Sequence, residues 1–292
     1  MKVIIKKRKP KEKIQQIINN SNYNIGIYVE SNGEILFAHN ENNQYEAASC
    51  IKLYILIEFY KQVAEGKIKE TDIIICNEEN DLEGVNPGII RLLHNGVHLT
   101  TKDLATLMIT YSDNLATNKL IELLGIDNIN QTIKELGLNK TKLHCPLNLL
   151  KYYKFGTTTP YEYAKTYQML LDEKVINKEI SKNCIEVLKL QETSDIIKKG
   201  LPQWDYLTKG TEESNINYIA SKSGTIIDDG DKMPNVRNDG GIISTKYGDY
   251  IFSIFISGVD DLQFNYDNKG IEIGAIINKC IYEEIKRRYR ND

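Results

Sequence analysis

Hydrophobic and polar positions divide the chain into β-rich ends and a helical middle. Two alternating apolar runs flank Ser31-Asn32-Gly33, and this pattern predicts a β-hairpin from residues 24–30 and 34–39. Later β-rich runs lie at residues 218–223, 240–244 and 250–257. Apolar residues at helical spacing predict helices at residues 11–20, 50–64, 101–124, 128–136, 160–172, 182–190 and 270–290.

This order of elements predicts a mixed α/β (α+β) fold. The β elements at both ends would assemble into one sheet, and residues from about 46 to 205 would form an all-helical insertion. No internal repeat and no low-complexity linker separates the chain into independent units, so we expect a single domain over residues 1–292.

Composition narrows the possible partners. The 292 residues include 41% hydrophobic positions, enough for a substantial core, and the formal net charge of −3 argues against nucleic acid as a partner. The five cysteines are scattered without metal-ligand spacing, which predicts reduced thiols and no metal. We expect a monomer that acts on a small molecule and needs no cofactor.

The first residues are basic and are not followed by the apolar stretch of roughly 7–15 residues that a secretory signal needs. No run is long enough to span a bilayer. The expected location is therefore cytoplasmic for the sequence as written, or secreted or periplasmic if a leader had been removed.

Candidate chemistry begins at Ser49-Cys50-Ile51-Lys52, where the long apolar helix starts. Residues three apart share a helix face, so the Lys52 amine could accept the proton of the Ser49 hydroxyl. Free N–H groups at the helix start could receive an oxyanion. Cys50 is another candidate nucleophile. However, the three-residue spacing to Lys52 starts at Ser49, and a cysteine at such a position is more often a small buried core residue.

Two further motifs follow this one. Ser112-Asp113-Asn114 suits a turn or helix boundary, and alone it is explained by capping; functionally, Ser112 could pass a proton to a leaving group and Asn114 could bind a substrate amide. Residues 222–225, Lys-Ser-Gly-Thr, end a predicted strand. Gly224 there lets a substrate approach the strand edge closely, although a plain strand-end turn explains it equally.

Together and in this order, S-x-x-K, S-D-N and K-[ST]-G resemble the signature of the class A serine β-lactamase family. The resemblance extends from about residue 22 to residue 290. It implies a β-lactamase/transpeptidase-like fold with a catalytic cleft between two lobes. One lobe, residues 22–45 with 215–292, would hold an antiparallel sheet covered by the terminal helices; the other, residues 46–214, would be all helical.

The resemblance also implies roles for the motif residues. Ser49 would be acylated, Lys52 would activate it, and Ser112 would shuttle a proton. Backbone N–H groups of Ser49 and Thr225 would form the oxyanion hole.

Substrate binding would fall to a second group. Asn114 would anchor an amide, Lys222 would anchor an anion, and Ser223 would contact a carboxylate beside Gly224. Arg237 is a further candidate for carboxylate binding and could equally be an ordinary surface arginine.

One departure from the family concerns deacylation. The family has a glutamate in a Glu-x-x-Leu-Asn pattern, which orients the water that frees the acyl-enzyme. The matching stretch places His144 at the glutamate position and Asn148 at its end, and no Asp or Glu occurs from residue 142 through 159. His144 is either a general base, since its ordinary pKa is near 6.5, or a loop residue without a role.

Without a base, acylation would proceed and deacylation would be slow, because a general base contributes about 10²–10⁴-fold. The main hypothesis is a serine hydrolase acylated at Ser49 by a β-lactam or a related amide. The alternatives are a penicillin-binding-protein-like peptidase or acyltransferase, and a non-hydrolysing binding protein with the same cleft.

Overall fold

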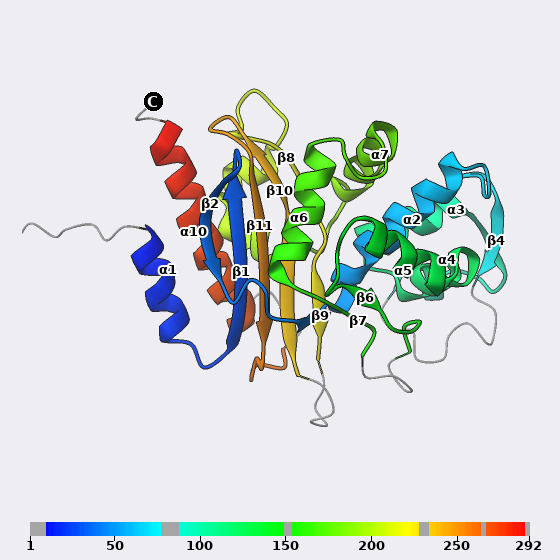
Figure 1. Ribbon diagram of the computed structural model, residues 1–292, viewed down its shortest axis with the longest axis horizontal. Helices are drawn as coiled ribbons and strands as arrows, with labels where there is room; N and C mark the ends of the chain where they lie inside the picture. The colour runs from blue at the N-terminus through cyan, green and yellow to red at the C-terminus, as the bar shows by residue number, and fades with distance from the viewer. Residues whose placement is uncertain (1–9, 77–87, 149–153, 228–233, 264–266, 290–292) are drawn as a thin grey trace, which may run out of the picture.

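The computed structural model describes residues 10–76, 88–148, 154–227, 234–263 and 267–289. Its centre is an antiparallel sheet assembled from both ends of the chain (Figure 1). In spatial order its strands are β2 (Glu34–His39), β1 (Asn24–Ser31), β11 (Tyr250–Ser257), β10 (Val236–Thr245) and β8 (Ile216–Ser221), with β9 (Gly224–Ile226) paired to the start of β10.

Helices cover both faces of this sheet. One face packs against α1 (Pro10–Asn19), α8 (Asp195–Gly200) and α10 (Lys269–Tyr289), through a core of mainly isoleucine side chains. The other face packs against α6 (Pro160–Leu171) (Figure 1). Tyr163 of this helix contacts Phe255 of β11 edge to face. The predicted hairpin and the predicted sheet from both termini are confirmed.

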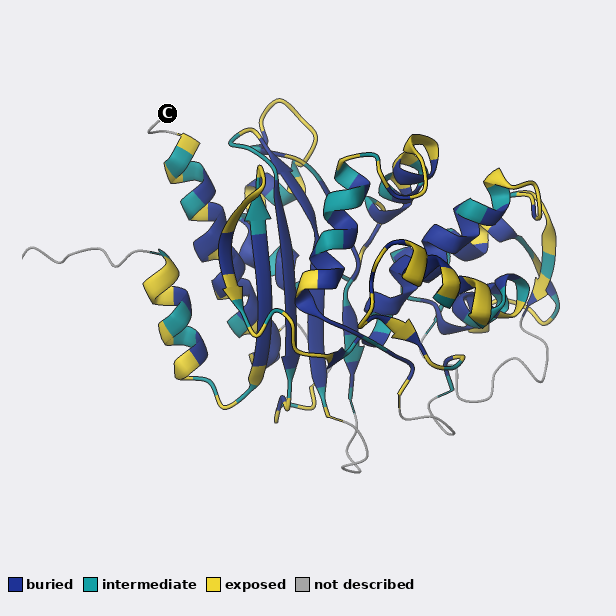
Figure 2. Ribbon diagram, in the orientation of Figure 1, coloured by how far each residue is buried: buried dark blue, intermediate teal, exposed yellow. Residues whose placement is uncertain are grey.

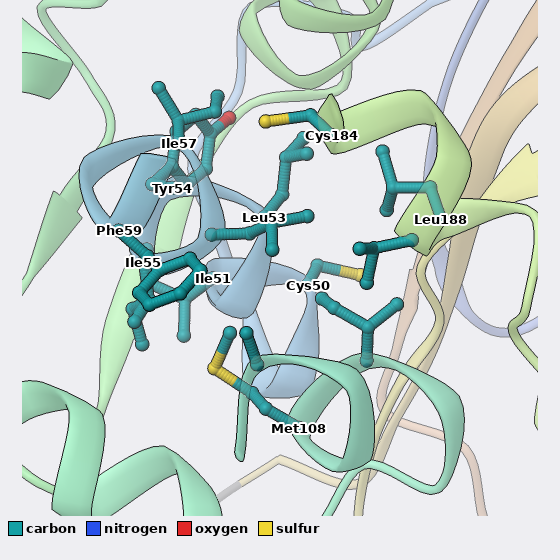
Figure 3. Packing of buried hydrophobic residues seen from close by; sticks show 14 of the residues in the cluster. Cys50, Ile51, Leu53, Tyr54, Ile55, Ile57, Phe59, Met108, Cys184 and Leu188 are labelled. Carbon is teal, nitrogen blue, oxygen red and sulfur yellow. The ribbon is translucent and has the colours of Figure 1, made fainter. Parts of the chain in front are cut away.

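The second lobe is built around α2 (Lys52–Ala64), whose residues from Leu53 to Tyr60 are all buried (Figures 2 and 3). Burial on every side explains why this helix is apolar all round rather than on one stripe. The helices that pack on or beside it are α3 (Thr101–Thr110), α4 (Asn114–Leu124), α5 (Ile126–Glu135) and α7 (Lys178–Leu188).

Several short elements were not visible in the apolar pattern. They are α9 (Gln203–Leu207), the turns η1 (Ala48–Ile51) and η3 (Ile90–Leu92), and the strands β3 (Tyr45–Glu46), β4 (Ile73–Cys76), β5 (Val97–Thr100), β6 (Lys142–Leu143) and β7 (Gly156–Thr158). Segments of two to five residues carry too few apolar positions to show a period.

The lobe limits expected from the sequence differ from the packing. The expected helical lobe, residues 46–214, contains α6 and α8, which pack on the sheet, and it also contains short strands. Among the described helices, none has the combined length and apolar character needed to cross a bilayer.

Candidate active site

Ser49 sits in the turn η1, immediately before α2. Ala48 has a φ of 48°, a left-handed conformation that is strained for a residue other than glycine. Ala48, Cys50 and Ile51 are buried, whereas Ser49 is only half-buried. The turn thereby presents Ser49 to a cavity of about 450 Å³.

The neighbouring thiol belongs to the protein interior. Cys50 lies among Leu53, Met108 and Leu188 (Figure 3), and its Sγ donates to the carbonyl oxygen of Lys222 at 3.4 Å. Burial raises the pKa of Cys50 to about 12. It therefore stays a thiol at neutral pH, which leaves the Ser49 hydroxyl as the candidate nucleophile of this turn.

The Lys52 amine is fully buried at the start of α2 and contacts the second motif. Its Nζ donates to the Ser112 carbonyl oxygen at 2.7 Å and to Asn114 Oδ1 at 2.8 Å, and it lies 3.0 Å from Ser112 Oγ. Burial, together with the charge of Lys222, lowers the pKa of Lys52 well below that of an ordinary lysine. This environment therefore favours the neutral form of the Lys52 amine.

Ser112 reaches Lys52 because the chain bends between α3 and α4. Ser112 has a φ of 56°, and Asp113 caps α4 by accepting from the N–H of Ala116 at 2.9 Å. Asp113 also accepts from the N–H groups of Ile89 and Ile90. The motif thus caps a helix and also turns Ser112 and Asn114 toward the lysine.

The expected pairing of Ser49 with Lys52 is not made in this structure. Within the described residues, the Ser49 hydroxyl forms no hydrogen bond, with Lys52 or with any other group. Catalytic hydrogen bonds are often long without substrate and tighten once it binds. In this structure the Lys52 amine contacts Ser112 rather than the Ser49 hydroxyl.

The third motif closes the cavity opposite Ser112. Ser223, Gly224 and Thr225 all line it, and β9 packs directly against η1. A Cβ on Gly224 would lie 2.8 Å from the Ala47 carbonyl oxygen and 3.0 Å from the Cys50 nitrogen. Only glycine allows this approach, which brings the backbone of Thr225 beside the turn that carries Ser49.

Gly224→Ala is expected to reduce the acylation rate of Ser49 by about 10²–10³-fold, the effect of losing one oxyanion donor. The added methyl group would push β9 away from η1, because the nearest atoms are two backbone atoms and the Ala48 Cβ, none of which can rotate aside. Stopped-flow or quenched-flow acylation by a chromogenic lactam measures this rate.

Gly26→Ala is the matched control. Its Cβ would meet the Tyr45 ring at 2.5 Å and Pro160 at 2.8 Å, in the sheet rather than in the cavity wall. It should lower thermal stability as Gly224→Ala does while leaving acylation near the wild-type rate. Equal acylation by both variants would contradict the close-approach argument.

Two predicted site residues lie behind the cavity wall rather than in it. Lys222 is fully buried, and its Nζ donates to the Ser223 carbonyl oxygen at 2.9 Å. Arg237 is 2% exposed and donates to the carbonyl oxygens of Val236, Ile226 and Gln263. Arg237 is therefore not the surface arginine considered as one possibility.

The two candidates for deacylation lie in the loop before β7. His144 is exposed, and its Nε2 lies 3.2 Å from Thr157 Oγ1. Burial and the charges of Lys142 and Lys154 lower the pKa of His144. Asn148 is half-buried. Neither side chain belongs to the cavity lining, which this loop reaches through Leu147.

Several lining residues were not among the predicted site residues, and they include Leu147, Phe155, Glu192 and Asp195. Leu147 is the leucine of the Glu-x-x-Leu-Asn pattern, whereas Phe155, Glu192 and Asp195 belong to no motif, and each of the four reaches the cavity through a loop or a helix end. The backbone of Leu147 is clamped by Asn118, whose side-chain amide donates to its oxygen at 2.7 Å and accepts from its nitrogen at 2.8 Å. The described residues contain no group of three or more potential metal ligands.

Known proteins resemble this chain over most of its length. The chain matches the profile of the beta-lactamase enzyme family over residues 9–285. It belongs to this family. It is 25% identical to beta-lactamase BRO-1 of Moraxella catarrhalis over 273 residues, covering 90% of this chain and 80% of that protein. It is 26% identical to beta-lactamase 3 of Bacillus cereus, with 91% and 78% covered.

Solved structures agree with this placement in the beta-lactamase enzyme family. A β-lactamase from Sphaerobacter thermophilus superimposes with a TM-score of 0.79 at 27% identity, covering 94% of this chain and 95% of that one. PBP-A shares the fold, with a TM-score of 0.77 at 23% identity over 95% and 96%. The chain is a serine hydrolase that resembles class A β-lactamases, and its predicted fold class is confirmed.

Proposed function

We propose that this protein opens β-lactam rings by forming an acyl-enzyme at Ser49, and that it releases the product slowly. The observation that carries the proposal is the cavity that brings residues of all three motifs together, with Lys52 buried behind Ser112. Ser49 Oγ attacks the lactam carbonyl carbon, the backbone N–H groups of Ser49 and Thr225 stabilise the oxyanion, and the carbon–nitrogen bond then breaks.

The proton travels from Ser49 to the leaving nitrogen. A neutral Lys52 has two N–H donors and one lone pair. It can donate to the Ser112 carbonyl oxygen and to Asn114 Oδ1 while it accepts from the Ser112 hydroxyl, 3.0 Å away. We assign Lys52 as the base that takes up the Ser49 proton once substrate is bound, and Ser112, whose Oγ lies 3.0 Å from the Lys52 Nζ, as the group that hands a proton to the leaving nitrogen.

Slow release rests on the loop before β7. Where this loop meets the cavity it presents the apolar side chain of Leu147, while His144 faces solvent. Water near the ester would find no base among the described residues through which this loop lines the cavity. Deacylation is therefore expected to be much slower than acylation, because a general base contributes about 10²–10⁴-fold to a rate.

The buried charge of Lys222 tunes Lys52, which gives a pH prediction. Since the Lys222 charge lowers the pKa of Lys52, Lys222→Met should raise that pKa. The acylation rate falls as pH drops and Lys52 takes up a proton, so the midpoint of this decline should move to higher pH in the variant. Acylation rates from pH 4 to 8 measure it, with the surface variant Lys189→Met as control; an unmoved midpoint would contradict the tuning.

Intact-mass spectrometry over time tests the proposed function. Incubation with benzylpenicillin should add one penicilloyl mass within seconds to minutes, and the adduct should decay much more slowly than it forms. Ser49→Ala should gain no mass, and Cys50→Ala should be labelled like the wild type. Rapid product without an adduct would refute slow release, and the absence of both adduct and product from several lactams would favour a binding protein or a different acyl donor.

A further inference from the structure

The cavity wall near β9 has the wrong charge for a substrate carboxylate. Among the described lining residues, the charged ones are Glu192 and Asp195, and both are acidic. The cations expected to hold a carboxylate lie behind the wall, with Lys222 bonded to the Ser223 carbonyl oxygen and Arg237 to three backbone carbonyls.

The Ser223 hydroxyl, expected to contact that carboxylate, is already occupied. It donates to the Thr193 carbonyl oxygen at 2.7 Å and accepts from Gln191 Nε2 at 3.1 Å. A serine hydroxyl has one proton to give, so it has none left for a substrate anion. The segment 191–195 therefore supplies the partners of the Ser223 hydroxyl in this structure.

Buried hydrogen bonds fix this segment in place. Asp239, fully buried in β10, accepts from Ser194 Oγ at 2.8 Å and from the Ile197 N–H at 3.0 Å. Ser221 Oγ donates to Gln191 Oε1 at 3.3 Å. The acidic side chains of Glu192 and Asp195 are therefore held against the cavity by the sheet rather than carried on a freely moving loop.

Asp195 is the better placed of the two acids. It is half-buried at the start of α8, whereas Glu192 is exposed. Desolvation raises the pKa of Asp195, although the charges of Lys198, Arg237 and Lys199 lower it in part. These cations thus do not compensate fully for the burial of the Asp195 carboxylate, which would gain from a positively charged partner.

We propose that this site selects acyl donors carrying a positively charged amine, rather than a carboxylate, beside Asp195, and that Asp195 determines this selectivity. The inference rests on the proposed acylation of Ser49 and names its substrate class. Removing one charge from a partly exposed position in the cavity wall changes relative rates by about tenfold.

Three penams with the same lactam and acyl side chain test this proposal. They differ in one group, a carboxylate, its primary amide or its aminoethyl amide, and intact-mass spectrometry gives the second-order rate constant of acylation for each. The wild type should prefer the aminoethyl amide over the amide and the amide over the carboxylate. Asp195→Asn should shift the ratio of carboxylate to aminoethyl amide by about tenfold or more toward the carboxylate.

Glu192→Gln removes the same charge from an exposed position and should shift this ratio less. An effect of Asp195→Asn that scales all three rates equally would show a merely structural residue and overturn the proposal, as would a wild-type preference for the carboxylate. If the neutral amide acylates Ser49 without any charge preference, only this inference fails. If none of the three penams acylates Ser49, the proposed function fails as well.

Discussion

Lys52→Arg will slow the acylation of Ser49 by about 10²–10⁴-fold, the contribution of a general base. Arginine keeps a positive charge at this position but does not lose its proton in proteins, whereas burial and Lys222 make the Lys52 amine easy to deprotonate. The variant should therefore also lose the decline at low pH that wild-type acylation shows when Lys52 takes up a proton. Single-turnover acylation measured from pH 4 to 8 gives both results.

Lys61→Arg is the matched control for this substitution. Lys61 belongs to the same helix, α2, and forms an ion pair with Glu135 at 2.6 Å near the surface. It should acylate at the wild-type rate, and circular dichroism with thermal unfolding should show that both variants are folded. If folded Lys52→Arg acylates like the wild type with an unchanged pH profile, Lys52 is not the base.

Leu147→Glu will accelerate release of the acyl group by about 10²-fold or more, provided that the new carboxylate activates water. Leu147 lines the cavity that Ser49 also lines, and Asn118 fixes its backbone through two hydrogen bonds, so a carboxylate at this position would belong to the same cavity. The lifetime of the penicilloyl adduct, followed by intact mass after removal of free penicillin, measures the change. Some loss of thermal stability is expected, because a buried leucine is replaced by an acid.

His144→Glu separates the structural argument from the sequence pattern. The pattern places the family glutamate at residue 144, but the structure places this side chain in solvent. We expect the adduct of this variant to persist as long as that of the wild type. A short-lived adduct in His144→Glu together with a long-lived one in Leu147→Glu would show that the loop rearranges when substrate binds.

Long elements were predictable because their patterns are long. The hairpin β1–β2 rests on two β-rich runs around an Asn-Gly turn, and the buried helix α2 rests on one long apolar run. The region at residues 101–124 was expected to be helical, and it consists of two helices because Asp113 caps the second. The strand β9 has only three residues, and its position depends on the missing side chain of Gly224.

The motifs identified several residues that line the cavity, but they could not predict which groups these residues contact. Their spacing predicted that Lys52 faces Ser49, yet a long lysine side chain can reach several acceptors, and here it contacts Ser112 and Asn114. Burial of Arg237 depends on carbonyl groups from β9 and from Gln263. Asp195 reaches the cavity because Asp239 holds its segment, which a local pattern does not reveal.

Locating the acyl group in the protein tests the central claim most directly. The protein is incubated with benzylpenicillin, digested under acidic conditions, and its peptides are fragmented in a mass spectrometer. The account predicts a penicilloyl group on Ser49 and none in Ser49→Ala. A group on Cys50, or on any residue outside the turn Ala48–Ile51, would contradict it.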